Sequence, residues 1–417
     1  MKRLVSAVFT VLLVASASRI ARAEQPPRTI RDRYLVLLHA NNADVRGAAD
    51  DLARRHGGKV LSVWTDLLRG FAIELPAAAA KGLAADSRVA SIEEDQEAQV
   101  AVACIMNSGN CNDGRVPWQL DRIDQDTLPL NGSYYPMARD GYGATIYVVD
   151  SGVRRGHPEF LDVETGLSRV STGGRTFVND GRGTEDCYSH GTYVASFAAG
   201  LTTGPASRAA IVPVRVLDCQ GRGSAQQTID ALNWIAGNGR GIVNISLYFN
   251  KSTAMDTAAT NLVNKGFVVV VAAGNDYMAN ACNYSPGRTW GVITVGATTS
   301  EDRLANFTNV GSCVSIFAPG WGVGGANGLH DDVNCSPGWN GTSVAAPQAA
   351  GVAALIWGND PSLSGSRVAE LTVGGGTSGV LKIESAVLRQ GTPNLLLHSA
   401  AGGGVFICHP EDDPDIR

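Results

Sequence analysis

Four long apolar runs in the second part of the chain predict strands that are buried on both faces. They span residues 144–149, 210–216, 241–245 and 266–272. Strands of a parallel sheet covered by helices on both sides have near-continuous apolar sequences of this kind. Segments 228–236 and 343–357 have helical patterns and lie between or after these runs. Residues 117–400 are therefore predicted to form one α/β domain with a mostly parallel sheet flanked by helices.

The first part of the chain has a different pattern, which predicts a small α+β domain over residues 32–100. Strands are expected at 34–38, 59–64, 70–75 and 89–92, and helices at 43–56 and 76–85. This βαββαβ order is typical of a ferredoxin-like unit. Residues 24–31, which include two prolines, are expected to be a linker before it.

Residues 101–116 separate the two predicted domains. The segment contains Cys104, Cys111 and several Asn, Gly and Asp residues, which are typical of loops. It is therefore expected to be a linker. Residues 401–417 are expected to be a C-terminal tail.

The N-terminus has the three regions of a signal peptide. Lys2 and Arg3 precede the apolar run 4–15, and Ala21-Arg22-Ala23 fits a cleavage site with small residues. The alternative is a membrane anchor, for which the apolar run is short. We therefore expect residues 1–23 to be a signal peptide, the protein to be secreted, and no membrane span to follow.

Charge and cysteine content narrow the classes of function. The chain has 417 residues and a net charge of -5, and no cluster of Lys and Arg suggests a nucleic-acid surface. It contains eight cysteines but no CxxC pair, so a zinc site has little support. In an exported protein an even number of cysteines favours disulfides, although these counts do not choose the pairing.

Two polar residues stand where chemistry would be expected in such a domain. Asp150 follows the run 144–149, and ligands of open α/β sheets bind beyond the carboxyl ends of strands. His190 begins a segment rich in small residues that is typical of a closely packed helix. The alternatives are a turn-forming aspartate and a structural histidine.

Ser343 and Asn275 occupy similar positions. Ser343 precedes an Ala-rich helical segment, where free N–H groups and the helix dipole favour developing negative charge. Asn275 follows the run 266–272, where its amide could donate to an oxyanion. Taken singly, Ser343 could be an ordinary N-cap residue and Asn275 a turn residue.

Together these residues lie in four motifs that resemble the subtilisin-like serine proteases, most closely the proteinase K and aqualysin-like branch. The motifs are Tyr147-Val-Val-Asp-Ser-Gly-Val153, His190-Gly-Thr-Tyr-Val-Ala195, Val270-Val-Ala-Ala-Gly-Asn275 and Asn340-Gly-Thr-Ser-Val-Ala-Ala-Pro347. The resemblance covers about residues 117–397. It includes the chain order Asp, His, Ser, which is also the order of the triad in subtilisin.

The resemblance implies a subtilisin-like fold and a catalytic triad of Asp150, His190 and Ser343. His190 would take the proton of Ser343 as the hydroxyl attacks a peptide carbonyl and forms an acyl-enzyme. The Asn275 amide and the Ser343 N–H would form the oxyanion hole. This chemistry needs no cofactor, and protein or peptide substrates would bind along Ser246, Leu247, Tyr248, Ala273 and Gly274.

The resemblance also implies that the small domain is an inhibitory propeptide. The enzyme would be a zymogen that cuts itself between about Val100 and Val116, and it is expected to be a monomer. One departure concerns the substrate edge, which is commonly Ser-Leu-Gly-Gly in the family and here reads Ser246-Leu-Tyr-Phe249. The two aromatic rings are expected to narrow or reshape the pockets beside that edge.

Disulfides and a calcium site are further implications. Cys187–Cys219 and Cys282–Cys313 match the branch's two bridges, which leaves Cys104–Cys111 and Cys335–Cys408 by elimination. A structural Ca²⁺ is expected from hard oxygen ligands that resemble a calcium loop of the branch. They are Asp121, Asp124, Gln125, Asn131 and Ser133. The alternative is a polar surface turn.

The sequence therefore predicts a secreted serine endopeptidase that is made as a self-processing zymogen. A second hypothesis is a convertase-like binding protein that cuts itself once, retains its propeptide and has little activity on other proteins. An esterase or lipase has little support, because no Gly-x-Ser-x-Gly motif occurs.

Overall fold

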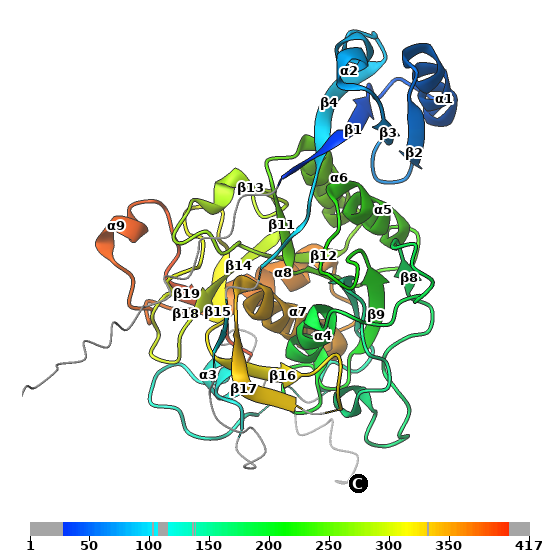
Figure 1. Ribbon diagram of the computed structural model, residues 1–417. Coiled ribbons are helices and arrows are strands. Elements are labelled where there is room, and N and C mark those ends of the chain that lie inside the picture. The colour runs from blue at the N-terminus through cyan, green and yellow to red at the C-terminus, as the bar shows by residue number, and fades with distance from the viewer. Residues whose placement is uncertain are drawn as a thin grey trace, which may run out of the picture.

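A computed structural model describes residues 28–101, 104–106, 116–135, 137, 139–331 and 333–399, with the backbone alone for 104–106 and 334–337. The predicted signal peptide, most of the predicted linker 101–116 and the predicted tail lie outside these residues. Two bodies make up the described chain (Figure 1), a small domain followed by a larger one.

A nine-stranded sheet forms the centre of the larger domain, in the order β18-β19-β15-β14-β12-β10-β7-β9-β8. Its paired strands run parallel, except that the edge strand β18 is antiparallel to β19. The strands are β7 (Thr145–Asp150), β8 (Arg175–Thr176), β9 (Ala210–Arg215), β10 (Ile242–Ile245), β12 (Val268–Ala272), β14 (Ile293–Thr298), β15 (Ile316–Pro319), β18 (Thr377–Ser378) and β19 (Leu395–Leu396). The predicted α/β class with a mostly parallel sheet is confirmed.

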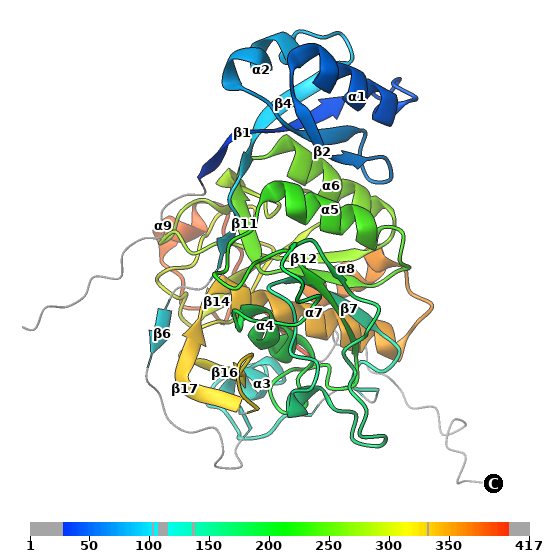
Figure 2. The same cartoon turned by 45° about the vertical axis from the view of Figure 1, so that its right-hand side comes forward.

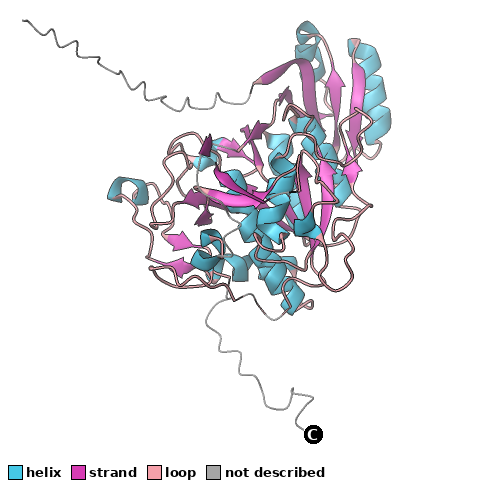
Figure 3. Cartoon of the chain, turned by 60° about the horizontal axis from the view of Figure 1, so that its bottom comes forward, coloured by secondary structure: helices cyan, strands magenta, loops and turns pink. Residues whose placement is uncertain are grey.

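Helices cover both faces of this sheet (Figure 3), as the apolar runs require. In β12, Val268, Val270 and Ala272 face the cluster with α4 and α7, whereas Val269 and Val271 face the cluster with α5 and α6. Alternate side chains of a strand point to opposite faces, so every position is apolar. The helices are α3 (Trp118–Ile123), α4 (His190–Ala199), α5 (Ala225–Ile235), α6 (Thr253–Asn264), α7 (Thr342–Asn359), α8 (Gly365–Gly374) and α9 (Ser385–Leu388).

The small domain is the predicted βαββαβ unit. Its antiparallel sheet has the order β2-β3-β1-β4, and the helices α1 and α2 pack on it around a separate core. The elements are β1 (Thr29–Leu38), α1 (Val45–His56), β2 (Lys59–Trp64), β3 (Gly70–Glu74), α2 (Ala77–Ala84) and β4 (Val89–Gln96). Because β1 begins at Thr29, the last three residues of the predicted linker 24–31 belong to the sheet.

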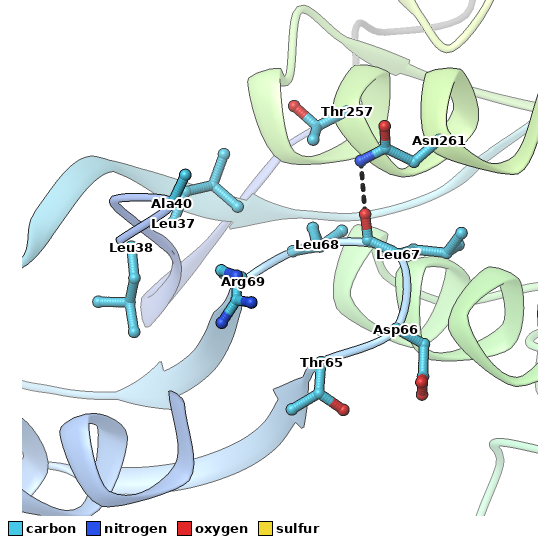
Figure 4. A pocket seen from close by; sticks show the side chains of 10 residues that line it. All are labelled: Leu37, Leu38, Ala40, Thr65, Asp66, Leu67, Leu68, Arg69, Thr257 and Asn261. Atoms are coloured by element: carbon cyan, nitrogen blue, oxygen red, sulfur yellow. Dashed lines mark hydrogen bonds between the residues drawn. The ribbon is translucent and has the colours of Figure 1, made fainter. Parts of the chain in front are cut away.

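The other face of the small sheet packs on helices α5 and α6. Leu35, Trp64 and Ala72 belong to the same buried cluster as the apolar residues of these two helices. Figure 4 shows the loop 65–69 against α6, where the Asn261 amide donates a hydrogen bond to the Leu67 carbonyl beside a hollow of about 400 Å³. The two domains therefore share an apolar interface.

Two acidic residues of β4 bind the N-termini of the same helices. Glu93 accepts hydrogen bonds from the N–H groups of Thr253 and Ala254 at 2.9 and 3.2 Å. Asp95, which is 1% exposed, accepts one from the Gln226 N–H at 3.0 Å. Free N–H groups and the positive end of the helix dipole meet carboxylates at both sites, which stabilises the docked arrangement.

Two three-stranded sheets connect distant segments. The first has the order β13-β11-β5 and the second the order β16-β17-β6. Their strands are β5 (Gln99–Val100), β6 (Cys104–Met106), β11 (Leu247–Asn250), β13 (Tyr284–Ser285), β16 (Val323–Ala326) and β17 (Val333–Asn340). Figure 2 shows β6 beside β17, at the edge of the larger domain.

Disulfide bonds join Cys187 to Cys219 and Cys282 to Cys313, the two pairs that the resemblance implies. The other two predicted pairs involve side chains outside the described ones. Among the helices that the structure describes, none has the length and apolar character needed to cross a membrane.

Candidate active site

Asp150, His190 and Ser343 each stand at the end of an element that the fold brings to one edge of the sheet. Asp150 is the last residue of β7, His190 is the first of α4, and Ser343 is the second of α7. All three side chains are at most 1% exposed. The carboxyl ends of the parallel strands meet at this edge, where α/β proteins bind their ligands.

Asp150 fixes the imidazole of His190. The Asp150 Oδ1 lies 2.7 Å from His190 Nδ1 and also accepts the Ser151 N–H at 2.7 Å. A carboxylate at Nδ1 favours the tautomer with the proton on that nitrogen, so Nε2 is left as the basic atom. Within the described part of the chain, Nε2 makes no hydrogen bond although it is buried.

A buried carboxylate that the sequence analysis missed supports this pair. Asp186 accepts hydrogen bonds from the Ser151 hydroxyl at 2.9 Å and the Thr192 hydroxyl at 2.6 Å, and burial raises its pKa. The Ser151 hydroxyl in turn accepts the Gly191 N–H at 2.8 Å. Asp186 thereby ties the loop after β7 to the first turn of α4. In the sequence, the feature that could have indicated this role of Asp186 is its position four residues before His190.

Ser343 lies in the first turn of α7, where the N–H groups lack partners within the helix. Its N–H donates to the Ala101 carbonyl oxygen at 3.1 Å. Pro347 has no N–H for the Ser343 carbonyl four residues earlier, and the Ser246 hydroxyl donates to that carbonyl instead at 2.8 Å. Ser246 therefore helps to hold the backbone of Ser343.

The starts of α4 and α7 lie at the same end of the molecule. Tyr193 of α4 and Val344 of α7 share one buried cluster. Farther along, the two helices pack so closely that a Cβ on Gly351 would lie 2.4 Å from the Ala198 carbonyl oxygen. The Ser343 Oγ and the His190 Nε2 are both buried, and neither has a hydrogen-bond partner among the described residues.

Asn275 is oriented by Thr342, the first residue of the helix α7 that carries Ser343. Its Oδ1 accepts the N–H of Thr342 at 3.0 Å and the hydroxyl of Thr342 at 2.9 Å. This arrangement turns the Nδ2 group away from Thr342, and among the described residues it has no acceptor. A buried amide donor without a partner is costly, which favours a functional role for it.

An extended segment of the small domain runs from its sheet into this site. It pairs with β11 in antiparallel register, Val100 opposite Leu247 and Gln99 opposite Tyr248. The Ala101 N–H continues the ladder to the Ser246 carbonyl at 3.3 Å. Main-chain hydrogen bonds of this kind are how proteins hold an extended peptide.

The backbone at Gly223 and Ser224 pairs with the other side of this extended segment. The Ala98 N–H donates to the Gly223 carbonyl at 2.9 Å, and Glu97 forms a bridge with Ser224. The sequence analysis did not include Gly223 or Ser224 among the substrate-binding residues; the two glycines in the run 221–223 were the available signal.

Ala273 and Gly274, which were predicted to bind substrate, follow β12. Gly274 adopts the left-handed φ of 97° that glycine tolerates.

The predicted calcium ligands gather around one loop. Asp121 on α3 accepts the N–H groups of Asn131 and Gly132, at 3.1 and 2.8 Å. Asp124 Oδ2 accepts the Tyr135 N–H at 2.8 Å. Gln125 Oε1 also accepts the Asn131 N–H, and the Asn131 side chain accepts the Ser133 N–H.

One oxygen of this loop fits a cation. The Asp124 Oδ1 is buried, and within the described chain it has no hydrogen-bond donor. Burial raises the pKa of Asp124, and the nearby carboxylate of Asp121 raises it further. A divalent cation would relieve this repulsion. Among the described residues, the group of acidic and sulfur side chains that lies close enough together to hold a metal is Asp180 with Cys187 and Cys219, and it is ruled out because both sulfurs are in a disulfide.

Comparisons with known proteins agree with this geometry. Residues 141–386 match the subtilase family. The chain belongs to this family. It is 37% identical to an extracellular serine proteinase of Thermus sp. (strain Rt41A), over 90% of this chain and 91% of the relative. It is 36% identical to alkaline serine exoprotease A of Vibrio alginolyticus, over 93% of this chain and 71% of the relative.

A solved structure gives the same result. The chain resembles a cold-adapted subtilisin-like serine proteinase with a TM-score of 0.62 and 39% identity, over 68% of this chain and 98% of that one. The protein is therefore a subtilisin-like serine peptidase, and this chemistry needs no catalytic cofactor. The predicted fold class is confirmed, and so is the resemblance to the subtilisin-like serine proteases that the four motifs indicated.

Proposed function

We propose that this peptidase is exported as a zymogen, cuts itself once, and then hydrolyses proteins with Asp150, His190 and Ser343 as its triad. The hydrogen-bonded pair of Asp150 and His190 supports these roles. The His190 Nε2 and the Ser343 Oγ, which have no hydrogen-bond partner among the described residues, support them as well. His190 accepts the Ser343 proton during attack and later donates it to the leaving amine, while Asp150 stabilises the imidazolium. Water then releases the acyl group.

The oxyanion of the tetrahedral intermediate would be held by two donors. The Ser343 N–H already binds a carbonyl oxygen, that of Ala101, at 3.1 Å. The Asn275 Nδ2 is turned by Thr342 and forms its bond only as negative charge develops on that oxygen. Donors fixed before the reaction stabilise the transition state because they need no reorganisation.

The observation that carries the proposal is the position of Ala101 at the nucleophile. Its carbonyl accepts from Ser343 and its N–H donates to Ser246. On the other side of the next peptide bond, β6 pairs with β17, Cys104 opposite Asn340. The chain is thus held on both sides of Ala101–Val102, and we assign this bond as the self-cleavage site.

Self-cleavage at this bond would give a mature enzyme that begins at Val102. The purified full-length chain is allowed to mature, and intact mass and N-terminal sequencing identify the new terminus. A terminus at any other residue would contradict the assignment of the bond. Casein hydrolysis after maturation tests the peptidase against the convertase-like binder, for which a stable two-chain complex without hydrolysis is expected.

Residues 28–101 would act as an intramolecular inhibitor until they are removed. The extended segment 97–101 pairs antiparallel with β11, as an extended substrate would, and the sheet of the small domain covers α5 and α6. Protein and peptide substrates would replace this segment along Ser246, Leu247, Tyr248, Ala273 and Gly274. Secretion through the signal peptide 1–23 and a monomeric mature enzyme complete the proposal.

A structural calcium ion is proposed for the loop around Asp121 and Asp124. Oxygen ligands of this kind suit Ca²⁺. A ligand that binds the folded state raises stability by mass action, so adding EDTA is expected to lower the melting temperature by several degrees. Asp124→Asn should lower the melting temperature in calcium and abolish most of the response to EDTA, whereas Asp126→Asn should respond like the wild type. An equal response of Asp124→Asn would contradict the site.

A further inference from the structure

Tyr248 lies on the face of β11 to which the side chain of Ala101 points, the last residue of the extended segment 97–101. Residues directly opposite each other in an antiparallel pair have side chains on the same face, and so do residues two positions away. Ala101 continues the ladder at Ser246, so Tyr248 is its diagonal neighbour on that face. Ala101 and Tyr248 are 0% and 1% exposed and belong to one buried cluster.

Phe249 lies on the opposite face of the same strand. Its side chain belongs to the cluster formed with α5 and α6, together with Leu247 and Met255. Of the two aromatic residues that depart from the family's Gly-Gly, Tyr248 alone is therefore directed at the side chain of the residue before the scissile bond. The sequence prediction that both rings reshape the pockets at this edge is therefore proposed here for Tyr248 alone.

Contacts with Tyr284 and Asp276 hold the Tyr248 ring in place. Its ring meets the edge of Tyr284, with centroids 5.4 Å apart and planes at 85°. Side-chain hydrogen bonds connect Asp276 with Tyr248, Tyr284 and Asn309. A Cβ on Gly274 would lie 3.4 Å from the Asp276 Oδ2, so the carboxylate lies beside Gly274, one of the predicted substrate-binding residues.

We propose that Tyr248 is a specificity-determining residue that closes the pocket for the side chain before the scissile bond, so that the enzyme cleaves after alanine or smaller residues. This inference rests on the proposed function and names its substrate class. A larger side chain would have to displace a buried ring that is held by Tyr284 and Asp276, and tightly packed sites tolerate added volume poorly. Ala101, the residue at the assigned self-cleavage site, has the size that such a pocket admits.

The test uses two peptide anilides, Ala-Gln-Val-Ala, which has the sequence of residues 98–101, and Ala-Gln-Val-Phe, which differs from it in the last residue. They are offered to the mature wild type, to Tyr248→Gly and to the control Phe249→Leu, with active sites counted by a fluorophosphonate. The wild type and the control should prefer alanine by on the order of 10² in kcat/KM. Tyr248→Gly should reduce this preference by about tenfold or more, through faster cleavage after phenylalanine.

A second measurement covers the case in which Tyr248→Gly does not mature. Ala101→Phe in the wild-type chain should slow self-cleavage by on the order of 10², whereas Ala101→Gly should mature at a rate close to the wild type. Equal cleavage after alanine and phenylalanine by the labelled wild type, an unchanged preference in Tyr248→Gly, or rapid maturation of Ala101→Phe would overturn the inference. Absence of labelling and of all hydrolysis would overturn the proposed function instead.

Discussion

Ser343→Ala is expected to slow peptide hydrolysis by about 10⁶, so that the purified full-length chain remains uncut for days. In the proposed mechanism His190 and Asp150 act on the Ser343 hydroxyl, and without it neither can contribute to covalent catalysis. Self-cleavage is followed by intact mass, which separates the full-length from the shorter form without an added substrate.

The matched control is Ser366→Ala, which removes an exposed hydroxyl from α8. This variant should mature at the rate of the wild type. If Ser343→Ala matured at that rate in a preparation free of other proteases, Ser343 would not be the nucleophile.

Asn275→Ala is expected to lower kcat by about 10²–10³ and to change KM little. Its Nδ2 has no acceptor among the described residues while the Ala101 carbonyl is bound, so its hydrogen bond would form mainly in the transition state. An interaction made only there raises kcat without tightening the binding of the substrate.

Kinetics of the mature variant on one peptide anilide separate kcat from KM. Asn283→Ala, which removes an exposed amide, should leave both constants unchanged. A fall in kcat of less than about threefold for Asn275→Ala, or a rise in KM that accounts for the whole loss, would contradict the role as an oxyanion donor.

Much of the fold could be predicted because burial on two faces leaves a strong mark on the sequence. The apolar runs 144–149 and 266–272 correspond to β7 and β12, with ends within two residues. The triad candidates followed from their motifs, each at a strand end or helix start. Here local sequence and position in the fold agree, since a carboxylate after a buried strand already lies at the edge of the sheet.

The pairing of the extended segment 97–101 could be predicted only in part. The resemblance implied the edge at Ser246 to Tyr248, but the register of β5 on β11, and the pairing of Ala98 with Gly223, depend on main-chain groups that every residue except proline carries. The sequence therefore held little information about which residue of the segment lies at Ser343. The face to which Tyr248 points was hidden as well, because a shift of one residue in register reverses the face of every side chain.

Activation of the Ser343 hydroxyl by His190 and Asp150 can be measured by covalent labelling of the mature enzyme. Treated with a fluorophosphonate at neutral pH, the wild type should take up about one label per molecule, and peptide mapping should find it on Ser343; His190→Ala should label far more slowly. A label on another residue, or equal rates for the wild type and His190→Ala, would contradict the account.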